Sequence, residues 1–115
     1  MNLDEKKQGD ILILSLSGEL MGGDESKDFQ DKIYKSIKEQ DVQLVVDMKD
    51  VKWMNSSGLG ILMAGLTTLR SSDGDLRLAN VSDRVRRPIE VTKLDQVLKI
   101  FDTVEDAVNS YSTGG

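Results

Sequence analysis

The hydrophobic and polar positions of this chain follow two alternating patterns. Short apolar runs bounded by turn residues predict buried strands, and longer stretches between them carry apolar residues at helical spacing. The run over residues 11–17 is the clearest strand, and Gly9-Asp10 before it predicts a hairpin with a short N-terminal strand. We expect further strands at residues 44–46, 76–81 and 97–101.

Helical patterns fill the gaps between these strands. Phe29, Ile33 and Ile37 recur every four residues in a stretch that Asp24 could cap and that runs to about residue 40. A second helix is expected from about Ser57 to residue 69 or 70.

Two more helices are expected in the last third of the chain. Ser82 can cap the first of them, but Pro88 lacks a backbone donor. We therefore expect an irregular first turn and a regular helix from about Pro88. Thr103 and Asp106 have the spacing of a capping box for the final helix.

The order of elements is therefore β-β-α-β-α-β-α-β-α. Strands that alternate with helices predict a single α/β domain with a mixed, mostly parallel sheet that opens on a hairpin. Gly18 is expected to end the second strand, and Lys49-Asp50 to begin a turn after the third. We expect the domain to cover residues 1–111 and residues 112–115 to form a flexible tail.

Composition narrows the possible functions. The chain has 115 residues, no cysteine and no histidine, which excludes disulfides, Cys/His zinc sites and Ser-His-Asp catalysis. Its net charge of −5 argues against direct nucleic-acid binding and favours a basic partner. No run is long enough to cross a bilayer and residues 1–7 lack a signal-peptide core, so we expect no membrane association and a cytoplasmic protein.

The most distinctive window is Trp53-Met54-Asn55-Ser56-Ser57-Gly58-Leu59-Gly60, which begins a charge-free stretch ahead of the second helix. A serine at a helix N-terminus can cap the helix, contact an anion or carry a phosphate. The Gly58-Leu59-Gly60 spacing is weak evidence for a phosphate-binding loop, because the lysine of a P-loop is missing. A phosphoacceptor serine would add roughly −1.5 to −2 charge there at pH 7.

The helix after the serines has two contrasting faces. One stripe is apolar and predicts a core contact: Leu59, Leu62, Met63, Leu66 and Leu69. The opposite face carries only small or apolar residues: Gly60, Ile61, Ala64, Gly65 and Thr68. Two interpretations remain open, because this second face is either covered by the domain itself or exposed as a docking face for another protein.

Several motifs resemble the STAS family, the anti-sigma-factor antagonist domains, over residues 11 to about 111. They are Leu16-Ser17-Gly18-Glu19-Leu20, Val45-Val46-Asp47-Met48 followed by Val51, Met54-Asn55-Ser56-Ser57-Gly58-Leu59-Gly60, and Val85-Arg86-Arg87 with Leu94. The first and third blocks, at this separation and in this order of elements, are the most specific.

This resemblance implies a regulator that works by partner switching. Family members of this type bind an anti-sigma factor that is also a serine kinase with a histidine-kinase-like ATPase fold. Phosphorylation by that kinase releases the antagonist, and a PP2C-type phosphatase restores it. The family's phosphoacceptor falls on Ser56, with Asp24, Asn55, Ser57 and Gly58 around it. Ser57 is then the expected helix cap.

The family pattern also brings departures and alternatives. Asn55 stands where the family often has Asp. Met21 follows Gly18-Glu19-Leu20, where relatives carry an Asp near the phosphosite, and Asp24 could partly substitute for it. Other STAS domains are non-phosphorylated scaffolds that regulate transporters or multi-protein complexes. A small hydrolase or nucleotide-binding enzyme is the alternative from another class. We expect no catalytic activity and no cofactor, since the kinase would supply ATP and Mg²⁺.

Overall fold

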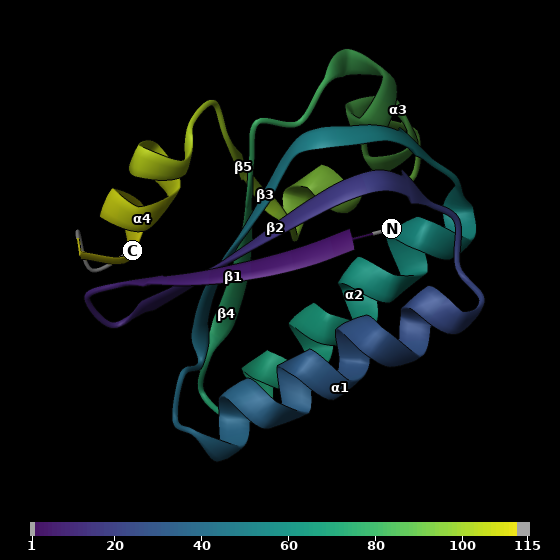
Figure 1. The fold of residues 1–115 in the computed structure, drawn as a ribbon. Coiled ribbons are helices and arrows are strands. Elements are labelled where there is room, and N and C mark those ends of the chain that lie inside the picture. The colour runs from purple at the N-terminus through teal and green to yellow at the C-terminus, as the bar shows by residue number, and fades with distance from the viewer. Residues whose placement is uncertain (1, 113–115) are drawn as a thin grey trace.

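A five-stranded sheet with the order β1-β2-β3-β4-β5 forms the centre of the molecule (Figure 1). The computed structural model describes residues 2–112, apart from the side chains of residues 24–26. β1 and β2 pair antiparallel, and the remaining neighbours pair parallel, as the sequence predicts. The strands are β1 (Asn2–Gln8), β2 (Ile11–Leu20), β3 (Gln43–Met54), β4 (Asp75–Ala79) and β5 (Lys99–Phe101).

The helices cover both faces of this sheet, but unequally (Figure 1). They are α1 (Asp24–Lys38), α2 (Ser56–Arg70), α3 (Asp83–Val91) and α4 (Val104–Ser112), with a short 3₁₀ helix η1 (Leu94–Gln96) before β5. The larger apolar cluster joins one face of the sheet to α1, α2 and α3. A smaller cluster joins the other face to α4 through Ala107. The predicted order of elements and fold class are confirmed.

β3 is longer than the sequence predicts. Lys49-Asp50 does not begin a turn, and Gly18 does not end β2, because the two strands remain paired as far as Leu20 and Met54. The register shifts between Ser15 and Ser17 and again after Gly18, whose φ is +94°. These irregularities bring buried side chains to every third position along the second half of β3: Met48, Val51 and Met54.

The prediction for the third helix also needs correction. α3 is helical from Asp83, and Pro88 lies inside it rather than at its start. The Ser82 hydroxyl accepts the N–H of Val85 at 3.4 Å, and the Ser82 carbonyl accepts the N–H of Arg86 at 2.8 Å. These bonds hold the first turn in place, and the helix continues through Pro88 although proline has no backbone N–H to donate.

Smaller boundary errors occur elsewhere in the fold. β4 ends two residues earlier than predicted. β5 is only three residues long, because the N–H groups of Val97 and Leu98 donate to the carbonyl of Leu94 in η1 (Leu94–Gln96). The Thr103 hydroxyl accepts the N–H of Asp106 at 3.0 Å, as the capping box predicts. Ser112 belongs to α4, while residues 113–115 of the predicted tail lie outside the described residues. No described helix is both long enough and apolar enough to cross a membrane.

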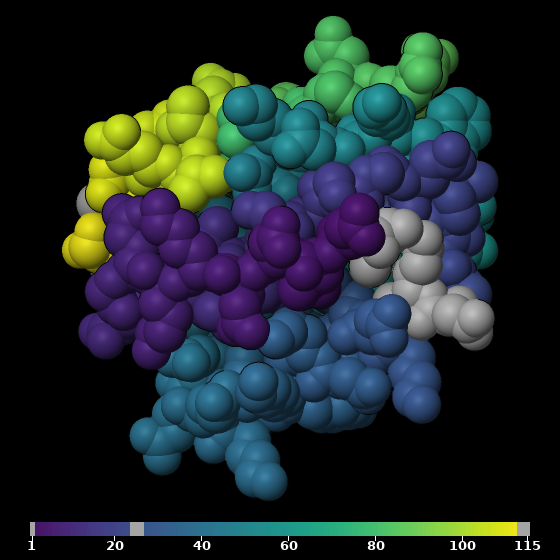
Figure 2. Space-filling view, in the orientation of Figure 1, coloured from purple at the N-terminus to yellow at the C-terminus, as the bar shows by residue number. Residues whose placement is uncertain are grey.

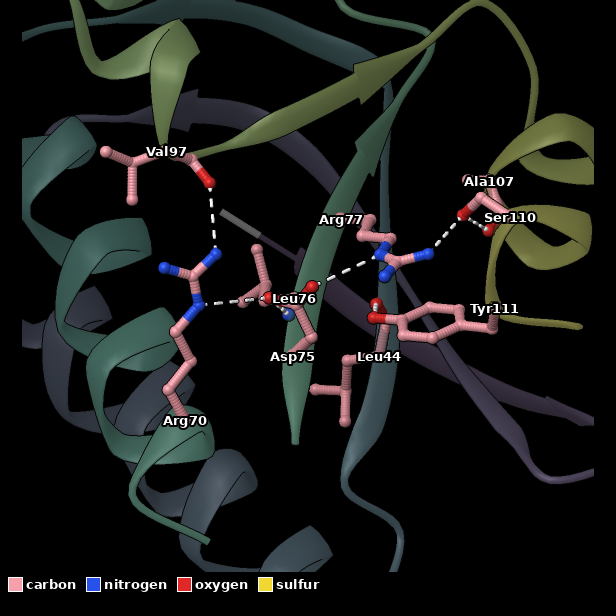
Figure 3. Close-up of polar contacts among 9 residues, drawn as sticks. All are labelled: Leu44, Arg70, Asp75, Leu76, Arg77, Val97, Ala107, Ser110 and Tyr111. Atoms are coloured by element: carbon pink, nitrogen blue, oxygen red, sulfur yellow. Dashed lines mark hydrogen bonds and ion pairs between the residues drawn. The ribbon is translucent and has the colours of Figure 1, made fainter. Parts of the chain in front are cut away.

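A buried arginine fastens α4 to the sheet (Figure 3). Arg77 of β4 is only 3% exposed, and its Nε lies 3.2 Å from Oδ2 of Asp75. Its Nη1 donates to the Ser110 hydroxyl at 2.6 Å, and its guanidinium lies 3.9 Å from the centre of the Tyr111 ring. The Tyr111 hydroxyl donates to the carbonyl of Leu44 at 2.6 Å. We call these five residues the α4 clasp.

Candidate functional site

The serine window lies where β3 passes into α2. β3 ends at Met54 and α2 begins at Ser56, so Asn55 alone joins them. The N–H of Asn55 donates to the carbonyl of Leu20, the last residue of β2, at 3.4 Å. The window therefore sits at the carboxyl ends of two parallel strands, the edge where α/β sheets commonly place their binding sites.

Asn55, rather than Ser57, caps α2. Its backbone is extended, with φ −103° and ψ −175°, and its Oδ1 accepts the N–H of Gly58 at 2.8 Å. The prediction that Ser57 is the cap is wrong, because the helix already starts at Ser56 and Ser57 is its second residue. Asn is among the preferred N-cap residues, so Asn55 before Ser56-Ser57-Gly58 is the sequence signal for this cap.

Gly58 lets the helix approach the end of β2 closely. A Cβ atom at this position would lie 1.9 Å from the carbonyl oxygen of Leu20, which no side chain can tolerate. Gly22 makes a similar approach to Ser57, since its added Cβ would lie 2.9 Å from the Ser57 Cβ. The loop after β2 thus packs against Ser57, and the start of α2 is held firmly against its neighbours.

Ser56 is the exposed first residue of α2. The first turn of this helix carries no acidic side chain, so no carboxylate of its own occupies the positive end of the helix dipole. A phosphoryl group on the Ser56 hydroxyl would therefore meet a favourable local field within the domain. Ser57 is exposed as well, so exposure alone does not separate the two serines.

The acidic residues that the sequence places near the window, Asp24 and Asp47, have different structural surroundings. Asp24 begins α1, but its N-cap residue is Gly23, and the Asp24 side chain lies outside the described residues. Asp47 accepts the N–H of Lys49 at 3.1 Å and the Asn80 amide at 3.0 Å, which gives it a structural role. Among the described residues, no group of three or more acidic side chains could hold a metal ion.

The small-residue face of α2 divides into two halves. Ile61 and Gly65 are buried inside the domain, and a Cβ at Gly65 would lie 2.8 Å from Cε2 of Phe29 in α1. Thr68 is half-buried and accepts a hydrogen bond from the Gln30 amide at 3.0 Å. The domain therefore covers Ile61 and Gly65 itself, and it partly covers Thr68.

Gly60 and Ala64 form the open half of that face. Both residues are exposed, and a Cβ added at Gly60 would meet nothing within 4 Å. The exposed part of this face is therefore narrower than the sequence predicts, because α1 contacts Gly65 and Thr68.

Three large apolar side chains outside α2 are exposed, and no pattern in the sequence marks them as a group. Met21 is 39% exposed, Trp53 is 45% exposed and Val91 is 72% exposed. A groove of about 410 Å³ runs between the end of β3 and α3, and its lining residues are Trp53, Met54, Arg84, Arg87, Pro88 and Val91. We call it the β3–α3 groove. Only the tertiary fold brings α3 to Trp53, so no local sequence signal could have found the groove.

The family follows from a direct comparison. The model of the STAS domain matches residues 2–107. The chain belongs to the STAS family. It is 33% identical over 70 residues to the anti-sigma-B factor antagonist of Bacillus subtilis, an alignment that covers 61% of this chain and 64% of that protein. The chain spans 64%, 58% and 54% of the lengths of three curated relatives that it matches.

Solved structures agree with this assignment. An anti-sigma factor antagonist from Mycobacterium paratuberculosis has a TM-score of 0.82 and 25% identity, over 95% of this chain and 92% of the other. A sulfate transporter family protein from Wolinella succinogenes has a TM-score of 0.78 and 17% identity, over 90% and 86%. The second likeness concerns the fold alone, so the fold by itself does not separate antagonists from other STAS proteins.

Proposed function

We propose that this STAS domain is an anti-sigma-factor antagonist whose partner binding is switched off by phosphorylation of Ser56. The observation that carries the proposal is the position of Ser56, exposed as the first residue of α2 and directly after the capping Asn55. The sequence similarity to the Bacillus subtilis anti-sigma-B factor antagonist favours this role over the non-phosphorylated scaffold.

The switch would act on the surface rather than on the fold. A phosphoryl group on Ser56 adds roughly −1.5 to −2 charge at pH 7, and the N-terminal end of α2 stabilises that charge within the domain. A partner docked over Gly60 and Ala64 would have to bury the same charge without a counterion. Burying an unpaired charge at an interface is strongly unfavourable, so the partner dissociates while the domain stays folded.

The partners in this scheme are two enzymes. An anti-sigma factor that is also a serine kinase, with a histidine-kinase-like ATPase fold, binds the unphosphorylated domain and then phosphorylates it. A PP2C-type phosphatase removes the phosphate and restores binding. The domain itself is a cytoplasmic regulator of transcription without catalytic activity or a cofactor of its own, and it acts through proteins rather than by direct binding to nucleic acid or membrane.

Mapping the phosphosite tests this function. The chain is used to recover partners from the native cytoplasm, and the recovered kinase is then incubated with wild-type protein and ATP. We expect mass spectrometry to find phosphate on Ser56 and not on Ser57. Ser56→Ala should abolish labelling, and Ser57→Ala, the matched control one residue away, should retain it. Phosphate on Ser57 alone would reverse the assignment, and transporter subunits in place of a kinase would favour the scaffold.

A further inference from the structure

Both β3 and α3 contribute apolar side chains to the β3–α3 groove, and α3 also contributes two arginines. Trp53 and Met54 are the last two residues of β3, and the α3 side is lined by Arg84, Arg87, Pro88 and Val91. Those four positions follow the i, i+3, i+4, i+7 spacing of a single helix face. Figure 2 shows the side chains of α3, in green, beside those of β3, in teal, at one edge of the molecule.

The opposite face of α3 packs into the core. Val85 and Ile89 are fully buried within the larger apolar cluster. By contrast, Trp53 and Val91 leave 45% and 72% of their surfaces exposed while lining the groove. Large apolar side chains left open in this way, side by side, commonly mark a protein-binding surface.

The charge at the groove is positive, although the whole chain has a net charge of −5. Arg84 and Arg87 are exposed and line the groove, whereas the acidic residues of the same helix, Asp83 and Glu90, do not. Within the described part of the chain, neither guanidinium forms an ion pair. An apolar groove with two unpaired arginines fits a segment that combines a bulky apolar side chain with carboxylates.

We propose that the β3–α3 groove binds an acidic, apolar segment of the anti-sigma factor. This inference rests on the proposed function and names the chemistry by which the partner is recognised. It refines the expectation of a basic partner, because the local charge at the groove is opposite to the net charge of the chain.

The position of the groove connects it to the switch. Ser56 follows Met54 by two residues, so their Cα atoms lie within about 7 Å of each other. A phosphoryl group on Ser56 would place its negative charge next to the β3 side of the groove, and we expect it to weaken the binding of an acidic segment there.

Peptide selection tests the groove without any kinase. The probe is a displayed library of random peptides long enough for three helical turns, selected against the wild-type chain. The enriched peptides are then tested for binding to the double variant Arg84→Glu/Arg87→Glu. The matched control is Lys35→Glu/Lys38→Glu, which makes the same change in net charge at two exposed positions in the last turn of α1. Circular dichroism verifies that both variants are folded.

We expect enriched peptides to combine Phe, Leu or Ile with Asp or Glu and to bind more weakly as salt is added. Their affinity should fall by about tenfold or more for the groove variant and stay unchanged for the control. Peptides rich in Lys or Arg, equal binding to both variants, or no enrichment at all would overturn the proposal. Peptides that reproduce acidic segments of this chain would overturn it in favour of a second copy.

The two proposals can fail separately. The selection measures the groove and requires no phosphorylation, whereas the phosphosite experiment uses the wild-type chain and requires no binding to the groove. Phosphate on Ser56 together with failed selection would retain the switch and remove the groove. Successful selection without phosphate on Ser56 would retain the groove as a binding site and remove the switch.

Discussion

At the scale of single residues, Asn55 caps α2 and directly precedes Ser56, the proposed phosphosite. Its Oδ1 accepts the N–H of Gly58, and the helix that it caps has no carboxylate in its first turn. We expect Asn55→Asp to keep this hydrogen bond and to add a charge that the helix dipole favours by about 0.3–1 kcal/mol. The variant should also be phosphorylated faster at Ser56, because Asp is the residue that the family often has there.

Thermal unfolding and initial phosphorylation rates check this prediction. Asn55→Ala is the control, and it should lower the free energy of unfolding by about 1 kcal/mol because the cap is lost. If Asn55→Asp is phosphorylated no faster than wild type, the residue does not influence kinase recognition. A loss of stability equal to that of Asn55→Ala would show that Asp does not cap this helix.

The two glycines near the start of α2 should respond to alanine in opposite directions. At Gly58 a Cβ would lie 1.9 Å from the carbonyl oxygen of Leu20, so Gly58→Ala forces the backbone apart and should cost about 1–3 kcal/mol or more. At Gly60 nothing lies within 4 Å, so Gly60→Ala should stabilise the protein by roughly 0.5–1 kcal/mol. Denaturant titration measures both, and equal effects would contradict the close approach at Gly58.

The sequence identifies the residues of the serine window correctly, but it does not identify which of them caps α2. Ser56, Gly58 and Asn55 all belong to the motif that the chain shares with the family. The exchange of roles between Ser57 and Asn55 arises because the helix starts one residue earlier than the hydrophobic pattern suggests. Helix ends depend on local hydrogen bonds rather than on periodicity, and for that reason they are hard to place from sequence.

At the scale of elements, α2 shows why periodicity alone could not decide which face meets a partner. Gly65 and Ala64 both belong to the same small-residue face, yet Gly65 packs against Phe29 of α1 and Ala64 is exposed. The packing of α1 against α2 is a tertiary contact, so the sequence left both interpretations open. β3 shows the same limitation, since Lys49 and Asp50 resemble a turn but occupy an irregular stretch of a continuous strand.

Ala64→Glu tests the exposed half of that face. Ala64 is exposed and Glu is a good helix former, so the free energy of unfolding should hardly change. In a complex the new carboxylate would be buried without a counterion, and we expect partner affinity to fall by well over tenfold, about 1.4 kcal/mol for each factor of ten. Calorimetry and thermal unfolding are measured on the same samples.

Ala64→Gln separates the charge of this substitution from its size. Gln has nearly the same shape as Glu, so a loss of affinity shared by both variants would point to steric exclusion instead of desolvation. Unchanged affinity in both variants would place the interface elsewhere. Unfolding of either variant would show that Ala64 is less accessible than the structure indicates.

At the scale of the whole molecule, the two ends of the parallel sheet have different tasks. The carboxyl ends of β2 and β3 carry the serine window, and the α4 clasp lies at the other end, near the starts of β3 and β4 at Leu44 and Asp75 (Figures 1 and 3). The clasp holds α4, which packs on the second face of the sheet. We therefore expect the clasp to set stability without altering the switch.

The free energy of unfolding at alkaline pH should depend on the α4 clasp, because the phenol of Tyr111 in the clasp resists ionisation. Burial, with a smaller contribution from the Asp75 carboxylate, raises the pKa of Tyr111 above its ordinary value near 10. In the unfolded chain the phenol loses its proton at about pH 10, while in the folded protein it keeps the proton. The free energy of unfolding should therefore fall as pH rises above about 10, by up to about 1.4 kcal/mol for each pH unit.

Tyr111→Phe isolates this effect from the lysines that titrate over the same range. The variant loses the hydrogen bond to Leu44 and should be about 1 kcal/mol less stable near neutral pH, but its stability should fall less steeply above pH 10. In Tyr34→Phe, Tyr111 is the remaining tyrosine of the two in the sequence, so tyrosinate absorbance should appear only as the protein unfolds. Absorbance that rises before the loss of circular dichroism would show that the phenol is accessible in the folded state. Tyr111→Phe and Asn55→Asp change opposite ends of the sheet, so their effects on the free energy of unfolding should add in the double variant.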